Sequence, residues 1–367
     1  MPRTPSTSGD VLRLIREEGV ATRAELGRLT GLSRPAVALR VSELVERGLV
    51  VERADGPSTG GRPPARLEFN AAGGAVLVAN LGQSRGQAAV CDLAGSVLAL
   101  ADVDPGDGLP RLLDHWAGLL KAAGLDPGSV RGAGLGVPGP VEFAAARWDG
   151  LDVRPPIAER FGVPAFVDND VNVAALGEYR AHYSGEVGDL LFVKASTGVG
   201  AGVIAGGRIQ RGALGAAGEI GHTPVSDGGG VRCGCGNLGC VEAVAGGAAL
   251  LARSGSPDLP ALTALARAGH EPTVALVREA GRRIGEVIAI AVNLLNPAVV
   301  VLGGDLARAD EPLVAGVREA VYRRSTALAT RRLRVEPSRL GDTAGLTGCA
   351  TMVIDHVLAP AAIDARP

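Results

Sequence analysis

The sequence predicts an α/β protein with a small helical domain at its N-terminal end, and shifts in composition support this prediction. Residues 1–70 begin with helical patterns, which are followed by Asp55–Pro64, a stretch rich in Gly, Pro and Ser. After Asn70, short β-rich runs and Gly-rich turns alternate with helices, which is typical of α/β architecture. A strand followed by a glycine turn occurs at Ala75–Gly82 and again at Leu190–Gly200, as in a duplicated α/β unit.

Composition restricts the classes of function. The 367 residues are 46% hydrophobic and 21% charged, which is enough to bury large cores. The formal net charge of −2 gives no global basic field, so any nucleic-acid site must be local. Lys121 and Lys194 are the only lysines, and the remaining basic residues are arginines, a bias that a GC-rich genome explains.

The sequence also indicates the compartment. It has no apolar core of a signal peptide near the N-terminus, and the longest apolar run, around Val287–Leu295, is too short to cross a bilayer. We therefore expect a cytoplasmic protein with no membrane partner. Cys91 and Cys349 lie in apolar contexts typical of a core, whereas the other three cysteines crowd into one loop. In a reducing compartment such a cluster indicates a metal rather than disulfides.

Three helices are predicted before residue 50. The first has an apolar face formed by Val11, Leu12, Leu14 and Ile15. The second begins at the capping box Thr22–Glu25, is expected to bury Leu26 and Leu29, and breaks at Gly31, with Leu32 filling the turn. The third is capped by Ser33, tolerates Pro35 in its first turn and ends at Gly48, with an inner face of Val37, Val41, Leu44 and Val45.

This order of helices, followed by a hairpin, is the winged helix-turn-helix pattern. Leu49–Glu52 and Arg66–Phe69 alternate like two strands, and the loop between them contains Gly60–Pro63, the expected wing. Arginine on the third helix can pair with guanine or phosphate, and Arg62 can enter a narrow minor groove. The residues expected to contact operator DNA are Ser33, Arg34, Pro35, Ala36, Arg40 and Arg62.

A protein-binding three-helix module is the alternative for this segment. Residues 1–70 contain eleven Arg against nine Asp and Glu, which is only a modest positive balance. The joint presence of a capped third helix and a wing arginine favours DNA.

A first polar motif follows a β-like run, at Val167–Asn172. Asn169 and Asp170 stand where a strand ends and a helix begins, so they point into the crevice there. A carboxylate and an amide suit recognition of sugar hydroxyls, and Asp170 could act as a general base. Capping of the helix is the alternative for this pair.

A second group of motifs combines Gly218–His222 with the loop Cys233–Glu242. His222, Cys233, Cys235 and Cys240 match a Cys₃His tetrahedral site, and we expect a structural Zn²⁺ there. Free thiols are the alternative. The ion would hold Glu219 and Glu242 rigidly, so that one sugar-binding ring is expected, formed by Asn169, Asp170, Glu219, His222 and Glu242.

Taken together, these motifs resemble the ROK family of bacterial sugar repressors and sugar kinases, over nearly the whole chain. The resemblance implies a two-lobed, actin-like fold, zinc at the Cys₃His motif and sugar contacts from the five ring residues. It also likens Gly136–Pro140 to the family's sugar-side loop and Leu302–Gly304 to its adenosine-side turn. We expect a winged helix-turn-helix domain at 1–70, a first lobe at 71–180, and a second lobe at 181–367 whose C-terminal helix returns to the first.

Two loops of this sequence differ from the phosphate loops of the family's kinases. Their first phosphate loop, Asp-x-Gly-Gly-Thr-Lys, is Asn80–Arg85 here, with an amide for the acid and Gln83 for a glycine. Their second, Gly-Thr-Gly-x-Gly, begins here with Ser196. Phosphoryl transfer depends on such loops, so we expect no kinase activity and no catalytic residue.

The sequence therefore favours a regulator, most simply a repressor, that binds operator DNA as a homodimer or homotetramer and responds to a sugar or sugar phosphate. An ATP-dependent, hexose-type kinase with an appended DNA-binding domain is the alternative, with Asp170 as its base. A constitutive DNA-binding protein with a vestigial pocket is a third hypothesis.

Overall fold

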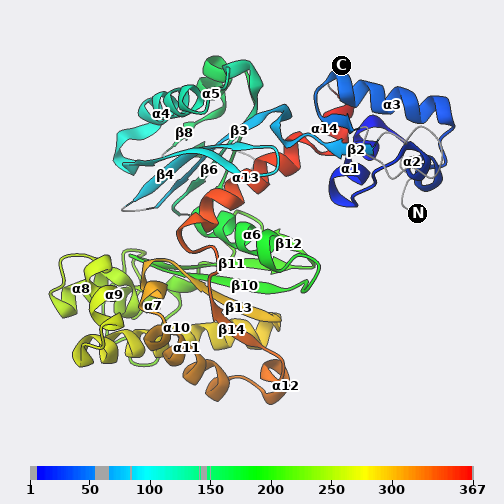
Figure 1. Ribbon diagram of the computed structural model, residues 1–367. Coiled ribbons are helices and arrows are strands. Elements are labelled where there is room, and N and C mark those ends of the chain that lie inside the picture. Colours follow the sequence, from blue (N-terminus) through cyan, green and yellow to red (C-terminus); the bar gives the residue numbers. More distant parts are fainter. Residues whose placement is uncertain are drawn as a thin grey trace.

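The computed structural model describes residues 6–53, 66–82, 85–139, 141, 147–148 and 150–365. These residues form a small N-terminal domain beside two α/β lobes that are stacked on each other (Figure 1). The α/β class and the N-terminal winged helix-turn-helix are therefore confirmed. Within the described residues, no helix is both long enough and apolar enough to span a membrane.

The N-terminal domain follows its capping signals. Thr22 accepts a hydrogen bond from Glu25 N, Ser33 accepts one from Ala36 N, and Gly31 ends the second helix in the left-handed conformation with φ of 70°. The expected wing loop, including Arg62, lies outside the described residues. The domain consists of α1 (Ser8–Glu17), α2 (Arg23–Thr30), α3 (Arg34–Glu46) and the antiparallel strands β1 (Val50–Arg53) and β2 (Arg66–Phe69).

Two details of this domain differ from the sequence prediction. Leu29 is 40% exposed rather than buried, because the inner face of α2 is formed by Leu26 and Thr30, one turn apart. A complete capping box between Thr7 and Asp10 begins α1, and it had not been predicted.

Both lobes contain a five-stranded sheet with the same strand arrangement. In each sheet three strands pair antiparallel, the central strand pairs in parallel with a fourth strand, and the fourth pairs in parallel with the fifth. The first sheet is β5 (Val97–Val103), β4 (Gly86–Asp92), β3 (Ala75–Leu81), β6 (Val130–Val137) and β9 (Ala165–Asn169). The second is β12 (Arg208–Gln210), β11 (Val199–Ala205), β10 (Leu190–Ala195), β13 (Val299–Gly303) and β14 (Arg334–Pro337). The repeated strand-and-turn pattern corresponds to β3 and β10.

Helices cover both sheets and fill the space between them (Figure 1). On the first sheet, α4 (Gly108–Ala122) and α5 (Arg154–Phe161) bury Trp116 and Ile157 on the outer face. Between the sheets, α6 (Asp170–His182) packs on β10 and β11, and α13 (Ala344–Val357) packs on β3 and β6. The remaining elements are β7 (Arg147–Trp148), β8 (Leu151–Asp152), α7 (Val241–Ala245), α8 (Gly247–Ser254), α9 (Leu259–Arg267), α10 (Glu271–Leu295), α11 (Glu311–Arg324), α12 (Ala327–Thr330) and α14 (Pro360–Asp364).

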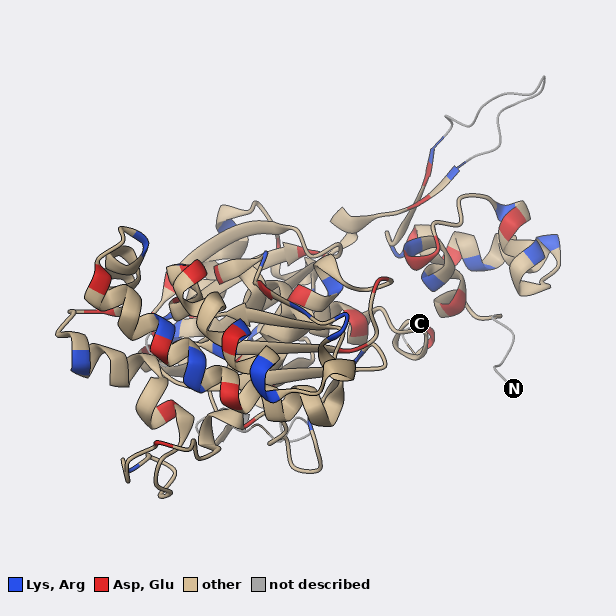
Figure 2. Cartoon of the chain, turned by 90° about the horizontal axis from the view of Figure 1, so that it is seen from below, with Lys and Arg blue, Asp and Glu red and all other residues tan. Residues whose placement is uncertain are grey.

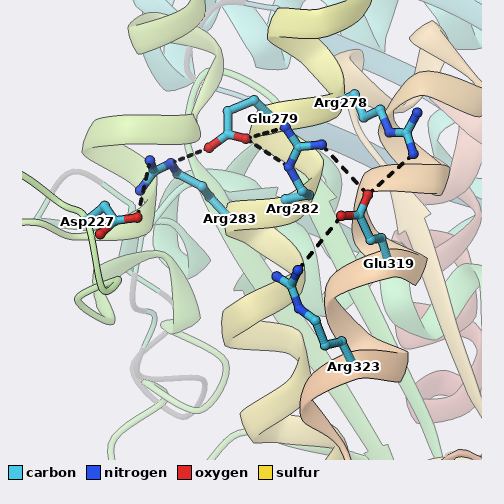
Figure 3. Close-up of polar contacts among 7 residues, drawn as sticks. All are labelled: Asp227, Arg278, Glu279, Arg282, Arg283, Glu319 and Arg323. Carbon is cyan, nitrogen blue, oxygen red and sulfur yellow. Dashed lines mark hydrogen bonds and ion pairs between the residues drawn. The ribbon is translucent and has the colours of Figure 1, made fainter.

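The outer pair α10 and α11 is joined by close backbone contact and by charge. A Cβ at Gly281 would lie 2.5 Å from Leu313 O, so the two helices touch along their glycines. Around this contact, alternating arginines and carboxylates form the network in Figure 3, in which Glu319 lies 3.3 Å from Arg278 and Arg283 lies 3.9 Å from Asp227. Such solvent-accessible ion pairs each add little stability, so the close packing of α10 against α11 is what mainly stabilises their contact.

The C-terminal helices connect the lobes to the N-terminal domain. From the cleft between the lobes, α13 runs outward, and the short α14 then packs against α1. Gly9 N donates to Asp364 Oδ1 at 2.9 Å and Arg47 Nη1 donates to Ile363 O at 2.8 Å. Asp355 of α13 pairs with both Arg16 of α1 and Arg180 of α6.

Candidate functional site

A cavity of about 250 Å³ lies between the two lobes. The ends of β3 and β9, the start of α6, the β10–β11 turn and the start of α13 all contribute to its wall. The structure brings the five residues of the expected sugar ring to this one cavity: Asn169, Asp170, Glu219, His222 and Glu242.

Asn169 is the N-cap of α6. Its Oδ1 accepts from Val171 N at 2.8 Å and Asn172 N at 3.2 Å, and its Nδ2 donates to Gly139 O at 2.8 Å. The capping alternative is therefore realised while the side chain still lines the cavity. The amide also ties α6 to the loop Gly136–Pro140, of which Pro140 lies outside the described residues.

Asp170 is paired with a lysine that the sequence analysis did not place in the site. Lys194, on β10, donates from Nζ to Asp170 Oδ2. Asp170 begins α6 and its side chain is 8% exposed, so the pair is largely shielded from solvent. The signal for Lys194 was available: it is one of two lysines and stands two residues before the second glycine loop.

Glu219 and Glu242 place two more carboxylates on the second-lobe wall. Burial raises the pKa of Glu219, the charges of Glu242 and Asp170 raise it further, and His222 opposes them. Glu242 Oε2 accepts from Val199 N at 3.0 Å. A Cβ at Gly198 would lie 2.5 Å from that oxygen, so the glycine loop leaves room for the carboxylate.

The four expected metal ligands converge as a group. One ligand atom from each of His222, Cys233, Cys235 and Cys240 lies within 4.8 Å of all the others. Cys235 and Cys240 sulfurs are 3.7 Å apart, and Cys233 Sγ is 3.5 Å from His222 Nδ1. A tetrahedral zinc with bonds of about 2.3 Å to sulfur and about 2.0 Å to nitrogen requires separations of about 3.8 and 3.5 Å. The residues therefore fit a metal.

His222 faces two ways. Its Nδ1 lies beside Cys233, whereas its Nε2 lies 3.6 Å from Glu219 Oε2. A ligating histidine commonly donates its second N–H to a carboxylate, which fixes the ring and its tautomer. One imidazole can thus belong to both the metal cluster and the cavity wall.

Carboxylates also occupy the other half of the cavity, near the two loops that resemble phosphate loops. Ser196 Oγ donates to Asp305, which directly follows the Leu302–Gly304 turn. Asp342 pairs with Arg85 at 3.2 Å and also with Arg308. Burial would raise the pKa of Asp342, but the hydrogen bond and charge of Arg308, together with Arg85, hold it below its usual value.

A largely buried ion pair crosses between the lobes near the expected sugar ring. Asp168 of β9 is 3% exposed and accepts from Arg211 Nε of the second lobe at 2.7 Å. Asn172 Nδ2 and Asn169 N also donate to this carboxylate, so its charge is well satisfied. The pair joins the first lobe to the second.

The expected DNA-contacting residues on α3 are accessible to different degrees. Ser33, Arg34 and Pro35 are exposed, whereas Ala36 and Arg40 are half-buried, and Arg40 pairs with Glu43 at 3.4 Å. Figure 2 shows basic and acidic residues interspersed over the chain, so positive charge for DNA is local rather than global.

Comparison with known proteins gives matches along almost the entire chain. The ROK family profile matches residues 77–356, and a winged helix-turn-helix DNA-binding profile matches residues 6–51. The chain is 30% identical to a xylose repressor of Caldicellulosiruptor bescii over 380 residues, which cover 95% of each chain.

Solved structures of both regulators and kinases are similar to this one. A ROK family transcriptional regulator, described as a homolog of the E. coli MLC protein, superposes with a TM-score of 0.81 at 28% identity, over 97% of this chain and 96% of the other. A ROK hexokinase from Thermus thermophilus superposes with a TM-score of 0.63 at 34% identity, over 76% of this chain and 97% of the other.

Proposed function

The chain belongs to the ROK family, and on this premise we propose that it is a sugar-responsive DNA-binding transcriptional regulator that represses carbohydrate-metabolism genes. The observation that carries the proposal is the presence, on one chain, of a winged helix-turn-helix and a sugar-type cleft, linked by α13 and α14. Both curated and structural relatives that cover the full length are named as repressors or regulators.

In this proposal the N-terminal domain, 1–70, binds a palindromic operator as part of a homodimer or homotetramer in the cytoplasm. The third helix enters the major groove with Ser33, Arg34, Pro35, Ala36 and Arg40, and Arg62 of the wing contacts the minor groove. Residues 71–180 and 181–367 form the two lobes that hold the effector.

We propose that Zn²⁺ is the metal of the Cys₃His cluster, because thiolate and imidazole donors in a closed tetrahedral set suit a structural zinc. His222, Cys233, Cys235 and Cys240 would hold it. The ion would supply rigidity, keeping Glu219 and Glu242 directed at the sugar hydroxyls together with Asn169 and Asp170.

We also propose that the protein is not a kinase. Asp170 is engaged by Lys194, and Asn80 stands where the family's kinases carry an acid. Asp170 then accepts from a sugar hydroxyl and catalyses no transfer. The ATP-dependent kinase remains the competing function, and kinases of the family share the fold of the lobes.

The sugar would act by favouring a closed cleft over an open one. Only a difference in affinity between the two states can shift their equilibrium. Closure changes the separation of the two winged helices in the dimer, whereas operator half-sites are fixed one or two helical turns apart. The expected coupling is about 1–3 kcal/mol, or about 5- to 150-fold in operator affinity, and DNA must weaken sugar binding by the same factor.

The test uses DNA fragments that the full chain selects from a random-sequence library. Fragment affinity is measured with and without D-xylose, D-glucose and N-acetyl-D-glucosamine, for wild type, Asp170→Ala and the surface control Asp114→Ala on α4. At least one sugar should weaken binding by wild type and the control, while Asp170→Ala binds DNA but does not respond. Equal responses in all three proteins would place the effector elsewhere, and failure to select any DNA would refute the proposal.

A further inference from the structure

The charged groups around the cavity are mostly acidic. Within the described residues its wall carries two cations, Lys194 and Arg85, and the carboxylates Asp170, Glu219, Glu242, Asp305 and Asp342. The acidic groups are spread over both halves of the cavity, so no part of the wall is a purely basic patch.

Both cations are already neutralised by the protein. Lys194 pairs with Asp170, and Arg85 pairs with Asp342, which also holds Arg308. A phosphate could approach Lys194 only by displacing Asp170, whose side chain is 8% exposed. The displaced carboxylate would lose its counter-ion in a poorly solvated place beside a new dianion, which is strongly unfavourable.

The half of the cavity nearest the glycine loops is also lined by carboxylates. Asp305 accepts from Ser196 Oγ, so a carboxylate faces the second loop. Glu242 lies behind that loop with Oε2 on Val199 N. The Val199 N–H, which could otherwise serve a phosphate, is therefore already bound to a carboxylate.

Hydroxyl groups meet no such penalty in this cavity. Carboxylates accept from hydroxyls, and the Lys194 ammonium can donate to a hydroxyl oxygen while remaining paired with Asp170. A cavity of about 250 Å³ also lies below the range of about 300–1,000 Å³ that drug-sized ligands occupy, which suits a single sugar ring.

We propose that the effector is an uncharged monosaccharide, and that the cleft rejects the phosphorylated form of the same sugar as well as nucleotides. This inference rests on the proposed function, because it concerns the ligand of the same cleft. Lys194 is the residue that sets the selectivity: it balances Asp170 and is thereby withheld from an anionic ligand.

The experiment is titration calorimetry at fixed salt with matched pairs: D-glucose and D-glucose 6-phosphate, N-acetyl-D-glucosamine and its 6-phosphate, and D-xylose and its 5-phosphate. In the pair whose sugar binds, the phosphate should bind at least about tenfold more weakly. The affinity ratio should shift towards the phosphate in Asp305→Asn and Asp342→Asn. It should not shift in Asp114→Asn, which removes a carboxylate from the outer surface of α4.

Three results would count against the proposal. A phosphate that binds as tightly as its sugar would overturn it and leave the regulator function intact. An affinity ratio that is unchanged in both cleft variants would overturn the charge argument. If no uncharged sugar in the panel binds and no phosphate does, the inference and the sugar-responsive function fail together.

Discussion

Gly9 offers a direct way to separate the N-terminal domain from the C-terminal helix. It lies in the first turn of α1, and a Cβ there would meet Pro360 of α14 with 2.5 Å to its Cα and 2.7 Å to its carbonyl carbon. All of these atoms belong to the backbone, so no side-chain rotation can relieve the clash. We expect Gly9→Ala to push α14 away from α1.

The free energy lost when α14 separates from α1 can be estimated from the contacts that hold α14. Ile363 is 2% exposed, and burial of such a side chain contributes about 1.5–3 kcal/mol. The bonds Gly9 N to Asp364 Oδ1 and Arg47 Nη1 to Ile363 O contribute about 0.5–1.5 kcal/mol each. Undocking of α14 from α1 should therefore cost about 2.5–6 kcal/mol, which weakens the connection between the N-terminal domain and the C-terminal helices.

The assay is the ratio of operator affinities without and with sugar. Gly9→Ala should still bind operator, because the substitution leaves the buried residues Val11, Leu26 and Val41 of α1, α2 and α3 in place. Its ratio should fall towards one, and its thermal midpoint should drop. Gly118→Ala is the matched control, since Gly118 also lies in a helix but has open space around it. A Gly9→Ala protein with the sugar response and thermal midpoint of wild type would refute the reasoning.

Three further outcomes are expected. Arg34→Ala or Arg40→Ala should weaken operator binding by about 1–3 kcal/mol if either contacts a base, and wild-type behaviour of both in salt-matched gel shifts would exclude these contacts. Metal analysis of protein purified without chelator should find about one zinc per chain, and Cys235→Ser should lose the zinc and bind sugar less tightly. Wild-type protein without zinc would contradict this prediction. No ATP-dependent phosphorylation of glucose, xylose or N-acetylglucosamine should be measurable, and turnover abolished by Asp170→Ala would favour the kinase.

Local signals were sufficient for much of the fold and the site. The helix caps at Thr22 and Ser33 and the left-handed Gly31 depend on neighbouring residues, so the sequence alone located α2 and α3. The Cys-Gly-Cys loop predicted the metal cluster for the same reason, since its glycines and cysteines are adjacent in the chain. The predicted burial of Leu29 was wrong, because Leu29 and Thr30 compete for one face of α2 and tertiary contacts place Thr30 inward.

Contacts made by residues outside the recognised motifs were not predicted. Asp305 and Asp342 belong to no motif, and only the fold brings them to the cavity wall. Lys194 could have been noticed from its rarity, but its pairing with Asp170 depends on the alignment of β10 with the start of α6. The contact between Gly9 and Asp364 joins opposite ends of the chain and rests on a helix of five residues, too short for a periodic pattern.

The packing of α6 against α13 suggests how the effector is sensed at the DNA-binding domain. Gly177 of α6 and Gly348 of α13 bring the two backbones so close that a Cβ at Gly177 would lie 2.7 Å from Gly348 N. Helices in such contact cannot slide independently without steric clash, so they should move as one body. Asp170 stands at one end of this body, whereas Asp355, α14 and α1 lie at the other. We therefore expect a ligand that shifts the start of α6 to move α13 and, through α14, the N-terminal domain, so that cleft closure need not be transmitted through flexible loops.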